Sequence, residues 1–110
     1  MKPSELLTKA KAVIADPKHW AQGQPAKDAK GQSVGPCTPQ AVCWCSLGAL
    51  DKVAHEENTY STHSTAAGYL AVVADECGYS GIPDFNDNSS HETVMKAWDE
   101  AIKLAKEDEK

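Results

Sequence analysis

The chain of 110 residues contains no arginine, and all 11 of its basic side chains are lysines. Arginine is the usual bidentate reader of guanine edges and the usual clamp on phosphate groups. The formal net charge is −5, and the lysines are dispersed among 16 acidic residues. Because counterion release from nucleic acid requires clustered positive charge, the sequence predicts a protein that binds neither DNA nor RNA. An acidic chain favours instead a partner with a basic surface.

Long apolar runs are also missing. No window approaches the roughly 18 apolar residues that a membrane span needs. Residues 1–5 lead into an amphipathic segment, not into the continuous apolar run of a signal peptide. We therefore expect a cytoplasmic protein that does not associate with membranes and whose four cysteines stay reduced.

The hydrophobic content of 41% is typical of one globular domain, here over residues 1–110. Most of the apolar residues recur with the spacing of a helix. The pattern predicts a helix over residues 4–15 with Ser4 as its cap, and a second over 38–55 that begins at Thr38-Pro39. Residues 56–62 form a polar linker, and a third helix covers 64–76 and ends at Cys77-Gly78. A capping box, Ser89 to Glu92, begins the last helix.

The segments between these helices contain glycine, proline and polar residues without an apolar period. We predict an all-α, compact four-helix domain with two long ordered loops, residues 21–37 and 78–88. The first loop turns as a short hairpin at residues 27–31, and Ile82 and Phe85 anchor the second. Gly48, inside the expected second helix, costs about 1 kcal/mol there, so close packing against another helix or a loop would account for it. The expected core comprises Leu6, Ile14, Val42, Cys45, Leu50, Val53, Leu70, Val73, Val94, Trp98 and Ile102.

Five short segments occur in a distinctive order: His19-Trp20, the turn at 27–31, the run 42–50 with its Cys-x-x-Gly-Ala-Leu pattern, Phe85-Asn86-Asp87, and the helix start at 91–94. As a set they resemble a family of small bacterial and phage proteins known only as a domain of unknown function. Phe85 stands where that family has tryptophan. The resemblance implies a cytoplasmic accessory protein of bacterial or phage origin, and it implies no established activity.

A thiol site is the first chemical possibility. A cysteine nucleophile needs a base and a group that orients the base, and Cys45, His91 and Asp87 (or Asn86) provide these residue types. The alternative is that Cys45 is a core residue, since it lies on the apolar face of the expected helix. In the middle of a helix, its thiol would gain little from the helix N-terminus.

Metal binding is less well supported. Zinc could draw on four cysteines and four histidines, but Cys43 and Cys45 would point about 200° apart on a helix, and the spacings differ from the Cys-x₂₋₄-Cys of structural sites. These candidates are Cys37, Cys43, Cys45, Cys77, His19, His55, His63 and His91. Asp84, Asn86 and Asp87 could hold a hard cation. The favoured interpretation is that Asn86 and Asp87 bond their own backbone and shape the turn.

Three tryptophans complete the candidates. Trp98 is expected in the core, Trp20 is expected to hold the first loop on the helices, and an exposed Trp44 would indicate an interface. The favoured alternative for Trp44 is packing beneath the loop 21–37. Residues expected to contribute to binding are Trp20, Trp44, Asp28, Asn86 and Asp87.

These observations favour a cytoplasmic accessory protein that binds another protein, in host interaction or in modulating defence, without a cofactor. The sequence holds no Gly-rich phosphate loop, no Gly-x-Ser-x-Gly and no His-Glu-x-x-His. The alternative is a small cysteine-dependent hydrolase or transferase that uses Cys45, His91 and Asp87.

Overall fold

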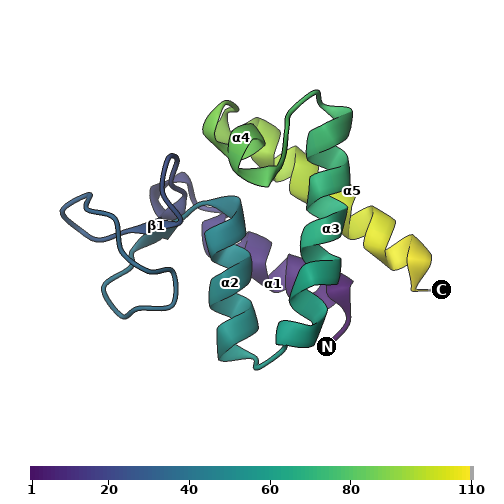
Figure 1. Ribbon diagram of the computed structural model, residues 1–110, viewed down its shortest axis with the longest axis horizontal. Helices are drawn as coiled ribbons and strands as arrows, with labels where there is room; N and C mark the ends of the chain where they lie inside the picture. Colours follow the sequence, from purple (N-terminus) through teal and green to yellow (C-terminus); the bar gives the residue numbers. More distant parts are fainter. Residues whose placement is uncertain (110) are drawn as a thin grey trace.

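The computed structural model describes residues 1–109 and is predominantly helical (Figure 1). Its elements are α1 (Pro3–Ile14), a 3₁₀ turn η1 (Pro17–His19), β1 (Ala26–Lys27), β2 (Cys43–Trp44), α2 (Ser46–Glu56), α3 (Tyr60–Glu76), α4 (Ile82–Asp87) and α5 (His91–Asp108). A mostly helical fold is confirmed. The expected class, all-α with four helices, is wrong because it lacks α4 and the small antiparallel sheet of β1 and β2.

Helix α1 is the central element and contacts α2, α3 and α5. Leu6, Leu7 and Ile14 on its inner face are fully buried, as the apolar period predicts. The helix begins at Pro3 and not after a Ser4 cap. Ser4 is buried, and its hydroxyl donates to Glu109 over 2.5 Å, which ties the two ends of the described chain together.

The expected second helix starts eight residues too early. Thr38-Pro39 forms a turn in which the Ala41 N–H donates to the Thr38 carbonyl, and α2 begins only at Ser46. The residues between are drawn into pairing with β1, so Val42 is exposed although it was expected in the core.

The remaining helices differ from expectation mainly at their starts. Helix α3 begins at Tyr60, inside the expected linker, and ends as predicted before Gly78, whose φ is +89°. Residues 82–87 were expected to be irregular, but they form α4. Ile82 is buried, as expected of an anchor. Ser90, not Ser89, caps α5 by accepting from the Thr93 N–H.

The core is otherwise close to expectation. Of the predicted residues, Val42 is exposed and Ile102 is half-buried. The others are buried: Leu6, Ile14, Cys45, Leu50, Val53, Leu70, Val73, Val94 and Trp98. Within residues 1–109, no helix combines the length and the apolar character needed to cross a bilayer.

Residues 22–42 lie to one side of the helices and are mostly exposed; we call them the projecting segment (Figure 1). The segment contains the predicted hairpin, in which Lys27 pairs with Ser33. It leaves the helical body near η1 and returns through β2, which leads directly into α2.

Candidate functional site

Asn86 is the central polar residue at the base of the projecting segment, and its side chain is completely buried. Its Oδ1 accepts from Trp20 Nε1 (2.9 Å), from the Ser46 N–H (3.0 Å) and from Ser46 Oγ (2.8 Å). Its Nδ2 donates to the carbonyl of Ala21 (2.9 Å) and to Asp87 Oδ1 (3.1 Å). The interpretation that Asn86 bonds its own backbone is therefore wrong, because its partners are mostly 40 to 66 residues away in sequence.

Asp87 forms a second anchor for the same segment. Its Oδ1 accepts from the Gly23 N–H over 2.8 Å. Beside it, Gln22 Nε2 donates to the carbonyls of Asn86, Asp87 and Ser89. The start of the projecting segment is thus held to the C-terminal end of α4 by two side chains, Gln22 from the segment and Asp87 from the helix.

The third anchor is a close backbone contact at Gly48. The Cys45 N–H donates to the Pro25 carbonyl over 3.0 Å, which places Pro25 directly against the first turn of α2. A Cβ at position 48 would lie 2.0 Å from the Pro25 oxygen. The prediction that close packing accounts for this glycine is confirmed, and the packing partner is the loop.

Cys45 is the N-cap of α2 and not a mid-helix residue, which corrects the sequence prediction. Its Sγ accepts from the Gly48 N–H over 3.3 Å, as a serine or aspartate does at this position. Burial is the largest cause that raises the pKa of the thiol; the N–H groups of Gly48 and Leu47 lower it, and the carboxylates of Asp87 and Asp51 raise it further.

His91 is held apart from the thiol by its own contacts. Its Nε2 donates to the Ile14 carbonyl over 2.7 Å, and its ring meets Trp20 edge-on with centroids 5.4 Å apart. Of the four candidate catalytic residues, Cys45 and Asp87 line a common hollow, and His91 and Asn86 are not among the described lining residues.

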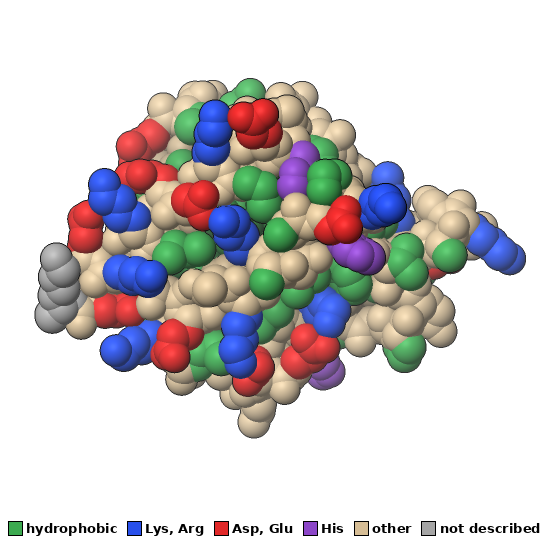
Figure 2. All heavy atoms as spheres, turned by 180° about the vertical axis from the view of Figure 1, so that it is seen from behind, with side chains coloured by type: hydrophobic (Ala, Val, Ile, Leu, Met, Phe, Trp, Pro, Cys, Tyr) green, Lys and Arg blue, Asp and Glu red, His purple; other side chains and the backbone are tan. Residues whose placement is uncertain are grey.

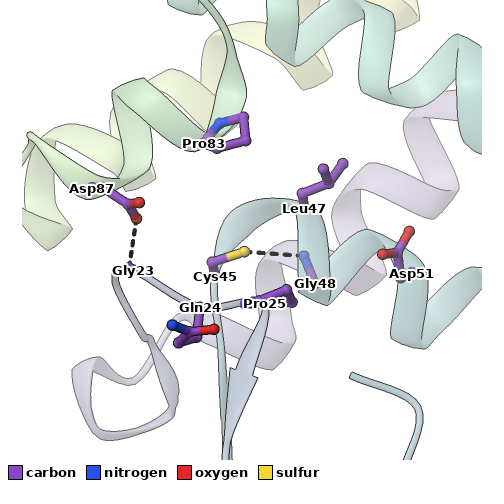
Figure 3. A pocket seen from close by; sticks show the side chains of 9 residues that line it. All are labelled: Gly23, Gln24, Pro25, Cys45, Leu47, Gly48, Asp51, Pro83 and Asp87. Carbon is purple, nitrogen blue, oxygen red and sulfur yellow. Dashed lines mark hydrogen bonds between the residues drawn. The ribbon is translucent and has the colours of Figure 1, made fainter. Parts of the chain in front are cut away.

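This hollow has a volume of about 130 Å³ and lies between the projecting segment, the first turn of α2 and α4 (Figure 3). Its walls are mainly apolar, while Asp51 and Asp87 stand on opposite sides (Figure 3). The lining residues are Gly23, Gln24, Pro25, Cys45, Leu47, Gly48, Asp51, Pro83 and Asp87.

A second hollow of about 380 Å³ lies between residues 36–41 and α2. Trp44 forms part of its wall and is only 9% exposed. Its indole N–H donates to the Pro36 carbonyl over 2.9 Å, and Lys52 Nζ lies 5.3 Å from its ring centroid. Trp44 therefore packs beneath the first loop, as the favoured alternative predicts.

The candidate metal ligands are dispersed, and no group of three or more suitable side chains lies together within residues 1–109. His19 contacts the Val42 carbonyl, His55 contacts the Tyr60 hydroxyl and His63 contacts Asp51. Cys37 and Cys77 are exposed and Cys43 is half-buried, all as free thiols.

Asp84, the remaining candidate for a hard cation, makes local hydrogen bonds. It accepts from the N–H and hydroxyl of Ser80 and from Asn88 Nδ2. These contacts shape the approach to α4.

A model of a family of unknown function, DUF6197, matches residues 1–104. The chain belongs to this family. No curated protein and no solved structure matches it. The matched range includes the segments on which the sequence resemblance was based.

In this DUF6197 chain, the Cys-x-x-Gly-Ala-Leu pattern has a clear structural meaning. Cys45 caps α2, Gly48 admits the Pro25 carbonyl, and Ala49 and Leu50 are fully buried. Together with Asn86, the pattern holds the projecting segment on the helices. The hydroxyl of Ser46 joins Asn86 to the indole of Trp98. This role could not be predicted, because a serine beside a helix start carries no signal of distant partners.

The thiol of Cys45 is expected to resist alkylation in the folded protein. Burial and a raised pKa reduce both its access to reagent and its thiolate fraction, since the thiolate is the reactive form. At pH 8, iodoacetamide should modify the exposed Cys77 while Cys45 stays intact, as measured by peptide mass spectrometry. In denaturant the two thiols should be modified at equal rates. Rapid modification of Cys45 without denaturant would contradict this arrangement.

Proposed function

We propose that this DUF6197 protein is a non-enzymatic accessory protein of the cytoplasm that binds another protein through its projecting segment. The observation that carries the proposal is that residues 22–42 are largely exposed yet are linked to one another by several hydrogen bonds. Long ordered loops on a rigid scaffold commonly carry binding functions.

The tip of the segment is ordered by Asp28. Its Oδ1 accepts from the N–H groups of Lys30 and Gln32, each over 2.9 Å, and its own N–H donates to the Gln32 carbonyl. Gly31 takes the left-handed φ of +80° that closes the turn. Asp28, predicted as a binding residue, supports the proposal as the residue that shapes the exposed tip.

A second turn precedes β2. The Thr38 hydroxyl donates to the Gly35 carbonyl over 2.8 Å, and the Trp44 indole holds Pro36 from below. A segment that is ordered before binding loses little conformational entropy on association. The segment is therefore suited to recognise a partner surface without refolding.

The charge of the chain favours a partner with a basic surface, because a net charge of −5 attracts such a surface over long range. On the face seen in Figure 2, lysines and acidic side chains are interspersed. Within residues 22–42 the charged residues are Lys27, Asp28 and Lys30, so the attraction for a basic partner comes from the acidic helical body beside the segment. The resemblance to bacterial and phage proteins favours a role in host interaction or in modulating defence.

A cysteine-dependent activity is less well supported by the geometry. Cys45 has its thiol occupied as a helix cap, and His91 uses Nε2 to hold the Ile14 carbonyl. A nucleophile needs a base within hydrogen-bonding reach, and no contact of this kind involves Cys45 within residues 1–109.

Site-specific photocrosslinking in the cell that carries the gene tests the binding function. A photoreactive residue at Lys30 or at Gln40, both exposed in the projecting segment, should crosslink one discrete protein. The matched control is the exposed Lys103 on α5, which should give none of that product. An additional Asp28→Ala change should lower the yield from position 30 by loosening the turn. The same products from all three positions, or none from 30 and 40, would refute the proposal.

A further inference from the structure

The hollow beside Cys45 lies at the base of the projecting segment, where a bound partner would cover it. Pro25 belongs to the segment, Leu47 to the first turn of α2 and Pro83 to α4, and all three present apolar surface to the hollow (Figure 3). Its volume of about 130 Å³ is well below the about 300–1,000 Å³ of pockets for drug-sized ligands and cofactors. The size fits a single side chain.

The charge at the edge of the hollow is entirely negative. Among the described residues that line it, the charged ones are Asp51 from α2 and Asp87 at the end of α4, and both reach solvent. Asp87 uses Oδ1 for the Gly23 N–H, and Asp51 Oδ1 lies 2.6 Å from His63 Nε2. Within residues 1–109, the second oxygen of each carboxylate makes no hydrogen bond, so both remain available to a ligand.

We propose that this hollow receives a lysine side chain of the partner protein, with its methylenes against Pro25, Leu47 and Pro83 and its ammonium group between Asp51 and Asp87. The proposal rests on the protein-binding function proposed above. An apolar stem with a cationic head matches apolar walls with an anionic edge. Lysine suits carboxylates on opposite sides because its three N–H donors rotate freely, whereas the planar fork of arginine suits one carboxylate held face to face.

Binding of a lysine analogue to the isolated full chain tests the proposal. Nα-acetyl-lysine N-methylamide should shift the amide resonances of Gly23, Leu47 and Gly48 in a saturable manner in a nitrogen–proton correlation spectrum. The norleucine analogue, which keeps the stem without the charge, should bind at least about fivefold more weakly.

Variants of the two aspartates test whether their carboxylates bind the ammonium group. Asp87→Asn keeps the oxygen that accepts from Gly23, and it should weaken binding of the lysine analogue by about fivefold, as should Asp51→Asn. Asp75→Asn removes the same charge from an exposed position on α3 and should leave the affinity unchanged. Circular dichroism spectra identical to wild type show that each variant is folded.

Several results would overturn the inference. These are equal binding of the norleucine analogue, unchanged affinity in both hollow variants, or shifts spread over the acidic surface. Tenfold tighter binding of free putrescine than of the lysine analogue would also overturn it, because the hollow would then be a small-amine site. If the analogue fails to bind while position 30 still crosslinks one protein, only the lysine inference fails. If no protein crosslinks, the binding function fails even where the analogue binds.

Discussion

Replacing Gly48 with alanine is expected to lower the free energy of unfolding by about 3 kcal/mol. The added Cβ would lie 2.0 Å from the Pro25 oxygen and 2.9 Å from its carbonyl carbon, and both are backbone atoms. Relief requires moving residues 24–26 away from α2, which breaks the hydrogen bond from the Cys45 N–H to Pro25. This loss outweighs the gain of about 1 kcal/mol that alanine brings to a helix. Urea denaturation followed by circular dichroism measures the change.

Gly68→Ala is the matched control for this experiment. Gly68 lies within α3 and is exposed, and a Cβ added there would meet no atom of another element within 4 Å. The same chemical change should therefore stabilise the protein by about 0.5–1 kcal/mol. If both variants shift stability in the same direction, the contact between Pro25 and α2 does not restrict position 48.

Asn86→Ala is expected to cost about 3–4 kcal/mol, which is large for one polar side chain. The change removes the oxygen that accepts three hydrogen bonds. The N–H and hydroxyl of the buried Ser46 and the indole N–H of Trp20 then lose their acceptor. Unsatisfied buried donors cost more than the hydrogen bonds contribute. The projecting segment should also loosen, which faster amide hydrogen exchange at Ala21 and Gly23 would report.

Asn88→Ala provides the comparison for Asn86. Asn88 follows α4 and is exposed, and its Nδ2 bonds only within the turn, to Asp84. Its replacement should cost less than about 1 kcal/mol and leave exchange at Ala21 unchanged. Equal losses at positions 86 and 88 would mean that Asn86 acts locally and does not anchor the segment.

The parts of the fold that the sequence predicts well are those set by local pattern. The apolar stripes of α1 and α5 place Leu6, Val94 and Trp98 in the core because a helical period needs no knowledge of distant partners. Gly48 is a related case. A glycine inside a helical pattern implies a compensating contact, and that contact exists, although its partner Pro25 could not be named.

The start of α2 could not be predicted because a distant pairing overrides a strong local signal. Thr38-Pro39 and the apolar residues after it satisfy the rules for a helix start. The Val42 N–H, however, donates to the Lys27 carbonyl, and the Cys45 N–H donates to Pro25. These donors are then unavailable to a helix. Because the helix was predicted to start too early, Cys45 was expected in the middle of a helix and not at its cap, and Val42 was expected in the core and not on the surface.

In the candidate site, too, local patterns could be predicted from the sequence and distant contacts could not. Asn86 and Asp87 stand out in the sequence, but the local rule for asparagine predicts a turn, whereas Asn86 bonds Trp20 and Ser46 across the fold. No sequence spacing shows that Cys45 and Asp87 share a hollow or that His91 is held at Ile14.

The anchors that hold the projecting segment lie at or just beyond its ends, at residues 20–25 and 44–48, whereas the tip at residues 28–32 is ordered by hydrogen bonds within its own turn. Residues 28–32 are accordingly free to change in length and composition without disturbing the interior, since exposed loop tips tolerate insertion. The fold is in this sense a display scaffold: a helical body with two fixed attachment points and an exchangeable recognition loop between them. Grafting a foreign peptide between residues 28 and 32 would turn the same framework toward a different target.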